Sequence, residues 1–227
     1  MRMCLAVEAE HFLEVLDVLN ELGGIEDHEL IGMGAGALLP AMIRAHGGLA
    51  RLRRYVLKER EKLREYFSVR NTLNLEGMVR SLLATLMKRV ASKPVSKLKE
   101  HIREVLKGVT VENVHVLAFD ITTGEEKELV TNRENCFDVL AAAISFPPLY
   151  EPVKIGDSLF CSLAYMTGIP GKGDFDFLVM SSYKEENDLP RSAIAIMERA
   201  DRLRTKSIMD RRLSLYKRVI VLGEENP

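Results

Sequence analysis

A glycine-rich turn between an apolar strand and an apolar helix constrains this chain more than any other feature. The run Leu30-Ile31-Gly32-Met33-Gly34-Ala35-Gly36-Ala37-Leu38 places three alternating glycines between apolar residues. The glycines have the spacing of a nucleophile elbow, G-x-S-x-G, in which a serine stands on a strained strand-to-helix turn. Here the central residue is Gly34, which can adopt such a turn but carries no nucleophile. The run therefore predicts the scaffold of a hydrolase without its attacking group.

Length and composition fit one globular domain. The chain has 227 residues, of which 47% are hydrophobic, so one domain can bury a substantial core. The formal net charge of −1 gives no general attraction to nucleic acid. The three cysteines, at positions 4, 136 and 161, are odd in number and far apart, which is typical of a reducing compartment.

The sequence shows no targeting or membrane-spanning segment. The N-terminal run reaches Glu8 too early for a signal peptide, and no apolar run approaches the ~20 residues that span a bilayer. We therefore expect a cytoplasmic protein with at most peripheral membrane contact. Abundant charged residues and the absence of glutamine also resemble the composition of proteins from thermophiles.

The N-terminal part alternates between strand and helix patterns. Residues 5–7 form a short apolar run typical of a buried strand, and apolar residues recur at helical spacing over 12–22. Residues 29–32 predict a second strand, and residues 35–45 a buried helix. This order favours an α/β fold with parallel strands.

Residues from 47 to about 108 carry no convincing strand pattern. Three helical stripes of apolar residues run through this stretch, and Gly108 closes it. The stripes are Leu52, Tyr55, Val56, Leu63, Tyr66 and Phe67; Leu82, Leu83, Leu86 and Met87; and Leu98, Ile102, Val105 and Leu106. We expect a helical cap that is inserted into a single α/β domain of residues 1–227.

Strand patterns return in the C-terminal half. The expected elements are two hairpins, an apolar strand, a long amphipathic helix and a last strand. Their ranges are 114–119 with 128–131, 153–155 with 158–161, 175–180, 193–215 and 218–222, and a short helix is expected at 137–144.

Three motifs in this order of elements carry a resemblance to a known family. Gly32-Met33-Gly34-Ala35-Gly36-Ala37 corresponds to an elbow of the form G-T-S-A-G-A. Ala143-Ile144-Ser145-Phe146-Pro147-Pro148-Leu149-Tyr150-Glu151-Pro152-Val153 corresponds to an A-S-x-x-x-P-x-x-x-x-P-V-type segment. Ser162-Leu163-Ala164, with Gly168-Ile169-Pro170, stands where a D-G-G and a following N-x-P are expected. Over nearly its whole length the chain resembles the bacterial patatin-like phospholipases, which are α/β lipid acyl hydrolases.

The resemblance implies a three-layer fold with a mostly parallel central sheet, and it also implies lost catalytic groups. Patatin-like enzymes use a Ser–Asp dyad, whose two positions fall on Gly34 and Ser162 here. Their oxyanion loop follows the first strand, where this chain has Glu8-Ala9-Glu10-His11, without a glycine and with two carboxylates. Backbone N–H donors to a developing oxyanion usually make the largest single catalytic contribution. Nucleophile, dyad aspartate and oxyanion glycines are thus missing together.

The glycine run has other interpretations. It fits a purely structural strand–helix turn. It also fits an anion site, because free N–H groups near Gly34 and Gly36 at a helix start can bind phosphate or carboxylate. A third interpretation is dinucleotide binding through G-x-G-x-x-A, which requires an acid at the end of a second strand ~20 residues on. That position falls near Glu59, in a highly charged helical stretch.

A relocated nucleophile is a further possibility at the lost aspartate position. Cys161 or Ser162 would need a nearby base. His11 could approach the site from the first helix. The five histidines are scattered without ligand or triad spacing, so no metal and no cofactor is predicted.

The helix after the glycine turn is locally basic. Arg51, Arg53, Arg54, Lys58, Arg60, Lys62 and Arg64 outnumber Glu59, Glu61 and Glu65. This face could touch an anionic membrane surface, or it is a solvated face with i,i+3 and i,i+4 ion pairs.

The sequence therefore predicts a catalytically inactive pseudoenzyme that keeps a pocket for a lipid, an acyl chain or an anionic small molecule. The expected ligand-binding residues are Gly32, Gly34, Ala35, Gly36, Cys161 and Ser162. Two other functions stay open at this point. One is an esterase or lipid acyl hydrolase that uses Ser162 or Cys161. The other is a structural subunit that binds a partner or a second copy of the chain.

Overall fold

A mixed central sheet organises the chain. The computed structural model describes residues 1–23, 28–67, 93–147, 149–171, 174–182 and 193–223. Eight strands form the sheet, in the order β5-β6-β3-β2-β1-β7-β8, and β4 also pairs with β3. The strands are β1 (Arg2–Ala6), β2 (Glu29–Met33), β3 (His115–Asp120), β4 (Glu125–Val130), β5 (Val153–Ile155), β6 (Ser158–Ser162), β7 (Phe177–Ser181) and β8 (Arg218–Leu222).

The strands from β8 to β3 pair in parallel, and the strands at the β5 end of the sheet pair antiparallel. Strands β8, β7, β1, β2 and β3 pair in parallel in that order. Strands β4, β5 and β6 add antiparallel pairs. The carboxyl ends of the parallel strands therefore lie along one edge of the sheet, where ligands of α/β proteins usually bind.

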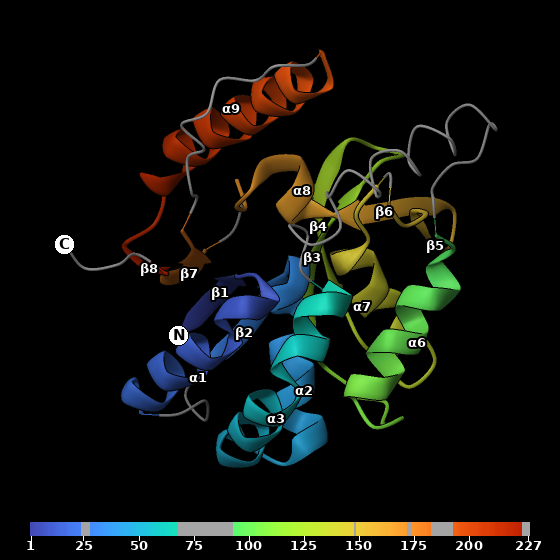
Figure 1. The fold of residues 1–227 in the computed structure, drawn as a ribbon, viewed down its shortest axis with the longest axis vertical. Helices are drawn as coiled ribbons and strands as arrows, with labels where there is room; N and C mark the ends of the chain where they lie inside the picture. The colour runs from blue at the N-terminus through green and yellow to red at the C-terminus, as the bar shows by residue number, and fades with distance from the viewer. Residues whose placement is uncertain (24–27, 68–92, 148, 172–173, 183–192, 224–227) are drawn as a thin grey trace.

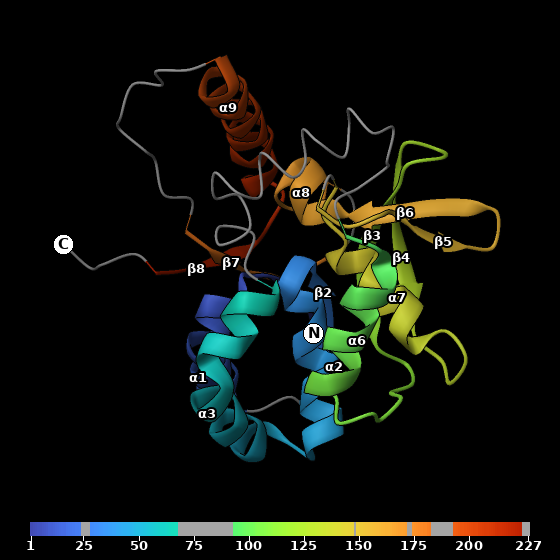
Figure 2. The same ribbon diagram turned by 45° about the vertical axis from the view of Figure 1, so that its right-hand side comes forward.

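Helices cover both faces of this sheet (Figures 1 and 2). One layer holds α1 (Phe12–Glu21), α2 (Leu38–His46), α3 (Leu49–Phe67), α6 (Val95–Val105) and α7 (Cys136–Ile144). The other face is covered by α8 (Leu163–Thr167) and α9 (Ala193–Leu213). Two short 3-10 turns follow the first two strands: η1 (Ala9–His11) after β1 and η2 (Gly34–Ala37) after β2. The expected three-layer α/β fold with a mostly parallel sheet is confirmed.

Side-chain alternation along the strands produces two cores. Met3 and Leu5 of β1 pack with the five-helix layer, and Cys4 between them belongs to a second cluster with Leu163 of α8 and Met209 of α9. Successive strand residues point to opposite faces, so one apolar strand supplies both layers. Burial of both faces explains the nearly continuous apolar sequence of the parallel strands.

The helices within the expected cap pack in the same layer as α1 and α2. Leu52 and Val56 of α3, and Leu98 and Ile102 of α6, belong to the buried cluster that also holds strand residue Val116. Residues 68–92, which include the stripe from Leu82 to Met87, lie outside the described residues. The inserted cap over 47–108 stays a prediction.

Several boundaries differ from the sequence expectations, and strand β4 begins three residues before the expected range of 128–131. The first strand begins at Arg2 and ends at Ala6, whereas the apolar run predicts residues 5–7. Polar Arg2 belongs to the strand because its backbone pairs with Glu29 and its side chain with carboxylates. Helix α8, which begins directly after β6, was not expected from the sequence. Among the described helices, none is long and apolar enough to cross a bilayer.

Candidate functional site

The glycine turn forms the connection between β2 and α2. Gly34 is the first residue of η2 and has φ of +57°, in the left-handed region that favours glycine. A β-carbon at position 36 would lie 2.2 Å from the carbonyl oxygen of Leu5, and one at position 32 would lie 2.3 Å from the α-carbon of Ala37. Gly32 and Gly36 therefore allow β1, β2 and the turn to approach each other. The strand–helix turn predicted from the sequence is present.

Gly34 and Ser162 face each other. A β-carbon built on Gly34 would lie 3.9 Å from Ser162 Oγ, and both residues are buried. The register of β3 explains this meeting. Residues 115–117 of β3 pair with β2, residues 118–120 pair with β6, and β4 occupies the other edge along the whole strand. Because β2 and β6 share one edge, the end of β2 meets the end of β6.

The site is closely packed. The same β-carbon on Gly34 would lie 2.9 Å from the β-carbon of Ala164, on α8. Ser145, in the segment after α7, holds Ser162 in place, because Ser162 N–H donates to Ser145 O at 2.7 Å. Ser145 Oγ donates in turn to Glu151 O at 2.8 Å. This segment, part of the family resemblance, thus fixes the end of β6.

Within the described residues, no base is hydrogen-bonded to Cys161 or Ser162, the two candidates for a relocated nucleophile. Cys161 is 1% exposed, and burial raises the pKa of its thiol to about 11, so little thiolate forms near neutral pH. Among the described residues, no hydrogen bond joins Ser162 Oγ or Cys161 Sγ to an imidazole, amine or carboxylate. An adjacent base of this kind is what nucleophilic catalysis by a serine or cysteine needs.

A serine–histidine pair that the sequence analysis missed lies at the ends of β1 and β7. Ser181 Oγ lies 2.7 Å from His11 Nδ1 and accepts a 2.9 Å hydrogen bond from the backbone N–H of Glu8. His11 Nε2 lies 3.9 Å from Glu10 Oε1. A β-carbon on Gly223 would lie 2.6 Å from His11 Nε2, so the glycine after β8 leaves room for the ring.

This pair occupies a favourable place in the sheet. From β1 the chain continues through α1 to β2 on one side, whereas β7 is followed by α9 and then by β8 on the other side. The carboxyl ends of β1 and β7 thus flank a topological switch point, where α/β proteins commonly bind ligands. Ser181 and His11 are 170 residues apart, and only the parallel pairing of β1 with β7 joins them.

The segment after β1 also departs from an oxyanion loop. Residues Ala9–His11 form the 3-10 turn η1, and the Glu10 carboxylate lies near His11 and Arg64. The N–H of Glu8, at the position expected for an oxyanion donor, donates to Ser181.

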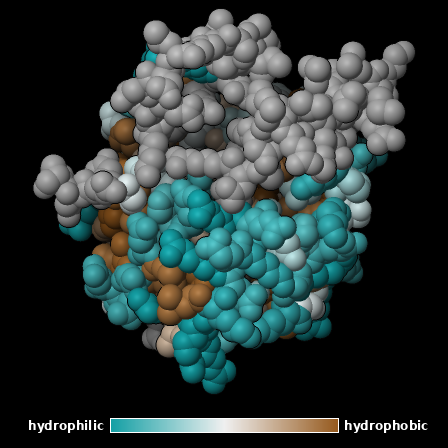
Figure 3. All heavy atoms as spheres, viewed as in Figure 1, coloured by the Kyte–Doolittle hydropathy of each residue, from teal (hydrophilic) through white to brown (hydrophobic). Residues whose placement is uncertain are grey.

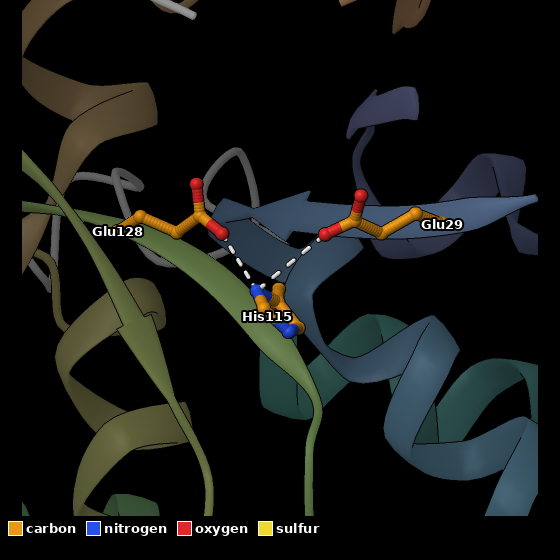
Figure 4. Close-up of side chains that lie close together, drawn as sticks. All are labelled: Glu29, His115 and Glu128. Atoms are coloured by element: carbon orange, nitrogen blue, oxygen red, sulfur yellow. Dashed lines mark hydrogen bonds and ion pairs between the residues drawn. The ribbon is translucent and has the colours of Figure 1, made fainter. Parts of the chain in front are cut away.

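A third cluster could hold a metal ion. Glu29, His115 and Glu128 offer ligand atoms that all lie within 4.8 Å of one another. Figure 4 shows the His115 ring between the two carboxylates, with Nδ1 2.6 Å from Glu128 and 3.7 Å from Glu29. Imidazole nitrogen and carboxylate oxygen are both groups that bind zinc.

Arg2 already neutralises these carboxylates. Its Nε lies 3.0 Å from Glu29, and its Nη2 lies 2.9 Å from Glu128. Burial alone would raise the pKa of Glu128, but hydrogen bonds from His115 and Arg2 outweigh it and lower that pKa. The cluster is therefore an ion-pair network across β1, β2, β3 and β4, and a metal would have to displace Arg2.

The dinucleotide interpretation finds no support in the fold. That fingerprint requires a strand, here β2, followed by a helix and then by a second strand that ends in an acidic residue. Here α2 leads directly into α3, and Glu59 lies inside α3, at a kink with φ of −104° and ψ of 18°.

Two pockets lie away from the glycine turn. One is lined by residues of α2, α3 and the segment after α6, and the other by residues near His28 and His115. Neither is lined by the six residues expected to bind a ligand, so those assignments stay predictions.

The fold and site together define a class: an α/β protein with a glycine turn at the carboxyl edge of its sheet, opposite a buried serine. No protein-family model matches the chain, and no curated protein matches it. Among solved structures, one similar chain belongs to the heterodimeric complex ExoU-SpcU from the type III secretion system of Pseudomonas aeruginosa. The TM-score is 0.39 and the identity 12%; the match covers 94% of this chain and 52% of that one. The chain thus spans about half the length of that neighbour.

Proposed function

We propose that this chain is a patatin-like protein that does not hydrolyse esters at its glycine turn. One observation carries the proposal: Gly34 and Ser162 stand where a nucleophile and its partner would face each other, with a β-carbon of residue 34 placed 3.9 Å from Ser162 Oγ. Glycine supplies no nucleophile, and Ser162 has no hydrogen-bonded base among the described residues. The geometry supports an inherited site that lacks the chemistry for acyl transfer.

The retained role of this turn, in this proposal, is to bind a lipid, an acyl chain or an anionic group. The turn opens η2 and α2, and the first N–H groups of a helix have no partners within the helix. Such groups favour a phosphate or a carboxylate. Because Ala164 packs against Gly34, a ligand would enter by displacing the five-residue helix α8.

Co-purified ligand tests this binding role. Native mass spectrometry of the purified chain should show added mass that is lost after organic extraction. Ala164→Leu, which enlarges the side chain over Gly34, should reduce the bound fraction, whereas Leu159→Ala on the exposed part of β6 should not. Absence of added mass in repeated preparations contradicts the binding role.

Reconstruction tests the inactive site. The native chain should not hydrolyse p-nitrophenyl esters of short or long acyl chains. Gly34→Ser with Ser162→Asp restores a possible dyad, and Ala164→Gly removes the 2.9 Å contact that a side chain at position 34 would meet. We expect the triple variant to gain turnover, and a matched Gly34→Ala, Ser162→Asp, Ala164→Gly variant to stay inactive. Turnover in the native chain that survives loss of Ser181 contradicts the proposal.

A second candidate function rests on Ser181 and His11. Their 2.7 Å contact lies at the switch point of the sheet, the arrangement that activates a serine. Ser181 Oγ would attack an ester carbonyl while its proton moves to His11 Nδ1, and His11 would return that proton to the leaving alcohol. Water would then release the acid and regenerate Ser181. Ester turnover that is lost in both Ser181→Ala and His11→Ala, and kept in Ser162→Ala, would establish this function.

A further inference from the structure

A pocket between the end of α2 and the start of α3 is lined mainly by cationic side chains. It has a volume of about 560 Å³, within the roughly 300–1,000 Å³ of small-molecule sites. Its lining includes five cationic side chains and no carboxylate: Arg44, Arg51, Arg54, Lys58 and Lys107, with Ala45, His46, Gly47 and Tyr55.

Three separate segments bring these cations together. Arg44 comes from the last turn of α2, Arg51 and Arg54 from the first turns of α3, and Lys107 follows α6. Gly47 ends α2 with φ of +73°, and a β-carbon there would lie 3.3 Å from Arg51 Nη1, so the glycine leaves space for that guanidinium. The clustering is thus a product of the tertiary fold and not of one basic helix face.

Lys58 Nζ pairs with Glu59 Oε1 at 3.7 Å and Arg44 donates to the backbone carbonyl of Glu112, so the uncompensated charge of the pocket is that of the other three cations. Within the described part of the chain, no carboxylate forms an ion pair with Arg51, Arg54 or Lys107. Arg53, on the same helix, pairs with Asp17 at 3.0 Å, and Lys62 pairs with Glu104. Like charges held close together repel, and a bound anion removes that cost.

The neutral lining residues also suit an anion. His46 Nε2 lies 3.0 Å from Val105 O, and burial, assisted by the charge of Lys107, lowers the pKa of its imidazole. The ring forms a wall of the pocket and packs against Tyr55 with 4.2 Å between centroids and 44° between the ring planes. Lys107 Nζ lies 5.9 Å from the Tyr55 ring, which holds this ammonium at the pocket.

We infer that this pocket binds a phosphate-bearing ligand, through the guanidinium groups of Arg51 and Arg54 with Arg44, Lys58 and Lys107 around it. Guanidinium groups bind phosphate oxygens in a bidentate manner, so two exposed arginines give more specificity than diffuse positive charge. The pocket lies where α2 ends and α3 begins. The ribbon of this junction is at the bottom of Figure 1. Since α2 runs back from the glycine turn, this site stands at the opposite end of that helix and is independent of the proposed function.

Binding measurements on the full chain test this site and identify the source of the phosphate. Calorimetry with inorganic pyrophosphate probes a free phosphate ligand. Flotation with phosphatidylcholine vesicles that contain phosphatidic acid, against phosphatidylcholine alone, probes a lipid headgroup. We expect Arg51→Ala/Arg54→Ala to weaken whichever binding occurs by at least about tenfold, the size of a lost charge-assisted hydrogen bond.

A matched variant separates a built site from general charge attraction. Arg60→Ala/Arg211→Ala removes the same charge from exposed positions outside the pocket and should bind as the native chain does. Pyrophosphate binding that depends on the pocket arginines supports a soluble phosphate compound; vesicle binding alone with the same dependence supports a lipid headgroup. The inference is overturned if the native chain binds neither probe, or if the two double variants lose binding equally.

Discussion

At the scale of single residues, three glycine positions record different constraints. Gly34 has a positive φ, whereas Gly32 and Gly36 are required because backbone atoms would lie 2.2 to 2.3 Å from a β-carbon. Real β-carbons do not approach backbone atoms so closely, so a side chain at either position would separate the turn from β1 or α2. Backbone packing thus requires glycine at positions 32 and 36, and backbone conformation favours it at position 34.

Replacement of Gly36 should therefore be severe. We expect Gly36→Ala to lower the free energy of unfolding by about 3 kcal/mol or more, because the new methyl group overlaps Leu5 O. Gly124→Ala is the control: φ there is +74° but no atom lies within 4 Å, so only roughly 1–2 kcal/mol of backbone strain is expected. Equal losses in urea unfolding would contradict the packing argument.

Asp120 should give the chain an acid-sensitive stability. Its carboxylate is fully buried and accepts hydrogen bonds from Lys127 Nζ at 2.7 Å, Ser158 Oγ at 3.0 Å and Thr122 N–H at 2.9 Å. The hydrogen bond from Lys127 chiefly holds the pKa of Asp120 well below its ordinary value of 3.8. The stabilisation is then present above pH 3.8 and is lost as the pH falls toward the pKa of the folded state.

Urea unfolding over a pH series tests this link. The native chain should be more stable than Asp120→Asn at neutral pH, and the difference should shrink as the pH falls below about 4. Asp157→Asn, in the exposed turn between β5 and β6, should show no such trend. A difference between native and Asp120→Asn that is constant with pH would refute the assignment.

At the scale of elements, local patterns located most strands and helices but not their long-range neighbours. Apolar alternation and capping glycines indicate where an element lies, and the helices near 12–22 and 137–144 appear where the sequence predicts them. The sharing of one β3 edge by β2 and β6 depends on strand register, which no local pattern records. That register places Gly34 against Ser162, which the family resemblance anticipated and periodicity could not.

Two clusters of side chains could not be predicted from the sequence, because local patterns do not record which strands pair. Ser181 and His11 meet only because β7 pairs with β1. Glu29, His115 and Glu128 share a sheet face because Glu29 lies two residues before Ile31, the partner of His115, and Glu128 two before Val130, its partner on β4. A polar residue at a strand end was the available signal in each case.

The ion-pair network around Arg2 should resist metal. We expect zinc not to raise the melting temperature of the native chain, because Arg2 pairs with both carboxylates. Arg2→Ala should allow a zinc-dependent rise, since Glu29, His115 and Glu128 then have no competing cation. Arg2→Ala/His115→Ala serves as the control. A zinc-dependent rise already present in the native chain would show that the cluster is a metal site.

At the scale of the whole molecule, the helices of the expected cap share one core with the sheet. Leu52 and Leu63 of α3, Ile102 of α6 and Val116 of β3 all belong to one buried cluster. Figure 3 shows that the outer surface over α3 and α6 is mainly hydrophilic, so the apolar sides of both helices face inward. The charged side chains of α3 therefore lie on its outer side, where some form ion pairs and others line the basic pocket.

This shared core predicts one cooperative unfolding transition for residues 1–227. Far-ultraviolet circular dichroism, which reports mainly helix, and fluorescence of a single tryptophan introduced by Phe177→Trp in β7 should give the same midpoint in urea. A helix-detected transition at clearly lower urea would instead assign the 47–108 region to a separate unit.

Covalent labelling of the native chain with a fluorophosphonate, followed by peptide mapping, tests the central claim most directly. The reagent modifies serines that an adjacent base activates. We predict no label at Ser162 in the native chain and a label at position 34 in the Gly34→Ser, Ser162→Asp, Ala164→Gly variant, which would show that the reagent can reach the site. A label on Ser162 of the native chain would contradict the inactive-site account, whereas a label on Ser181 that is lost in His11→Ala would establish the second candidate site as that of a serine hydrolase.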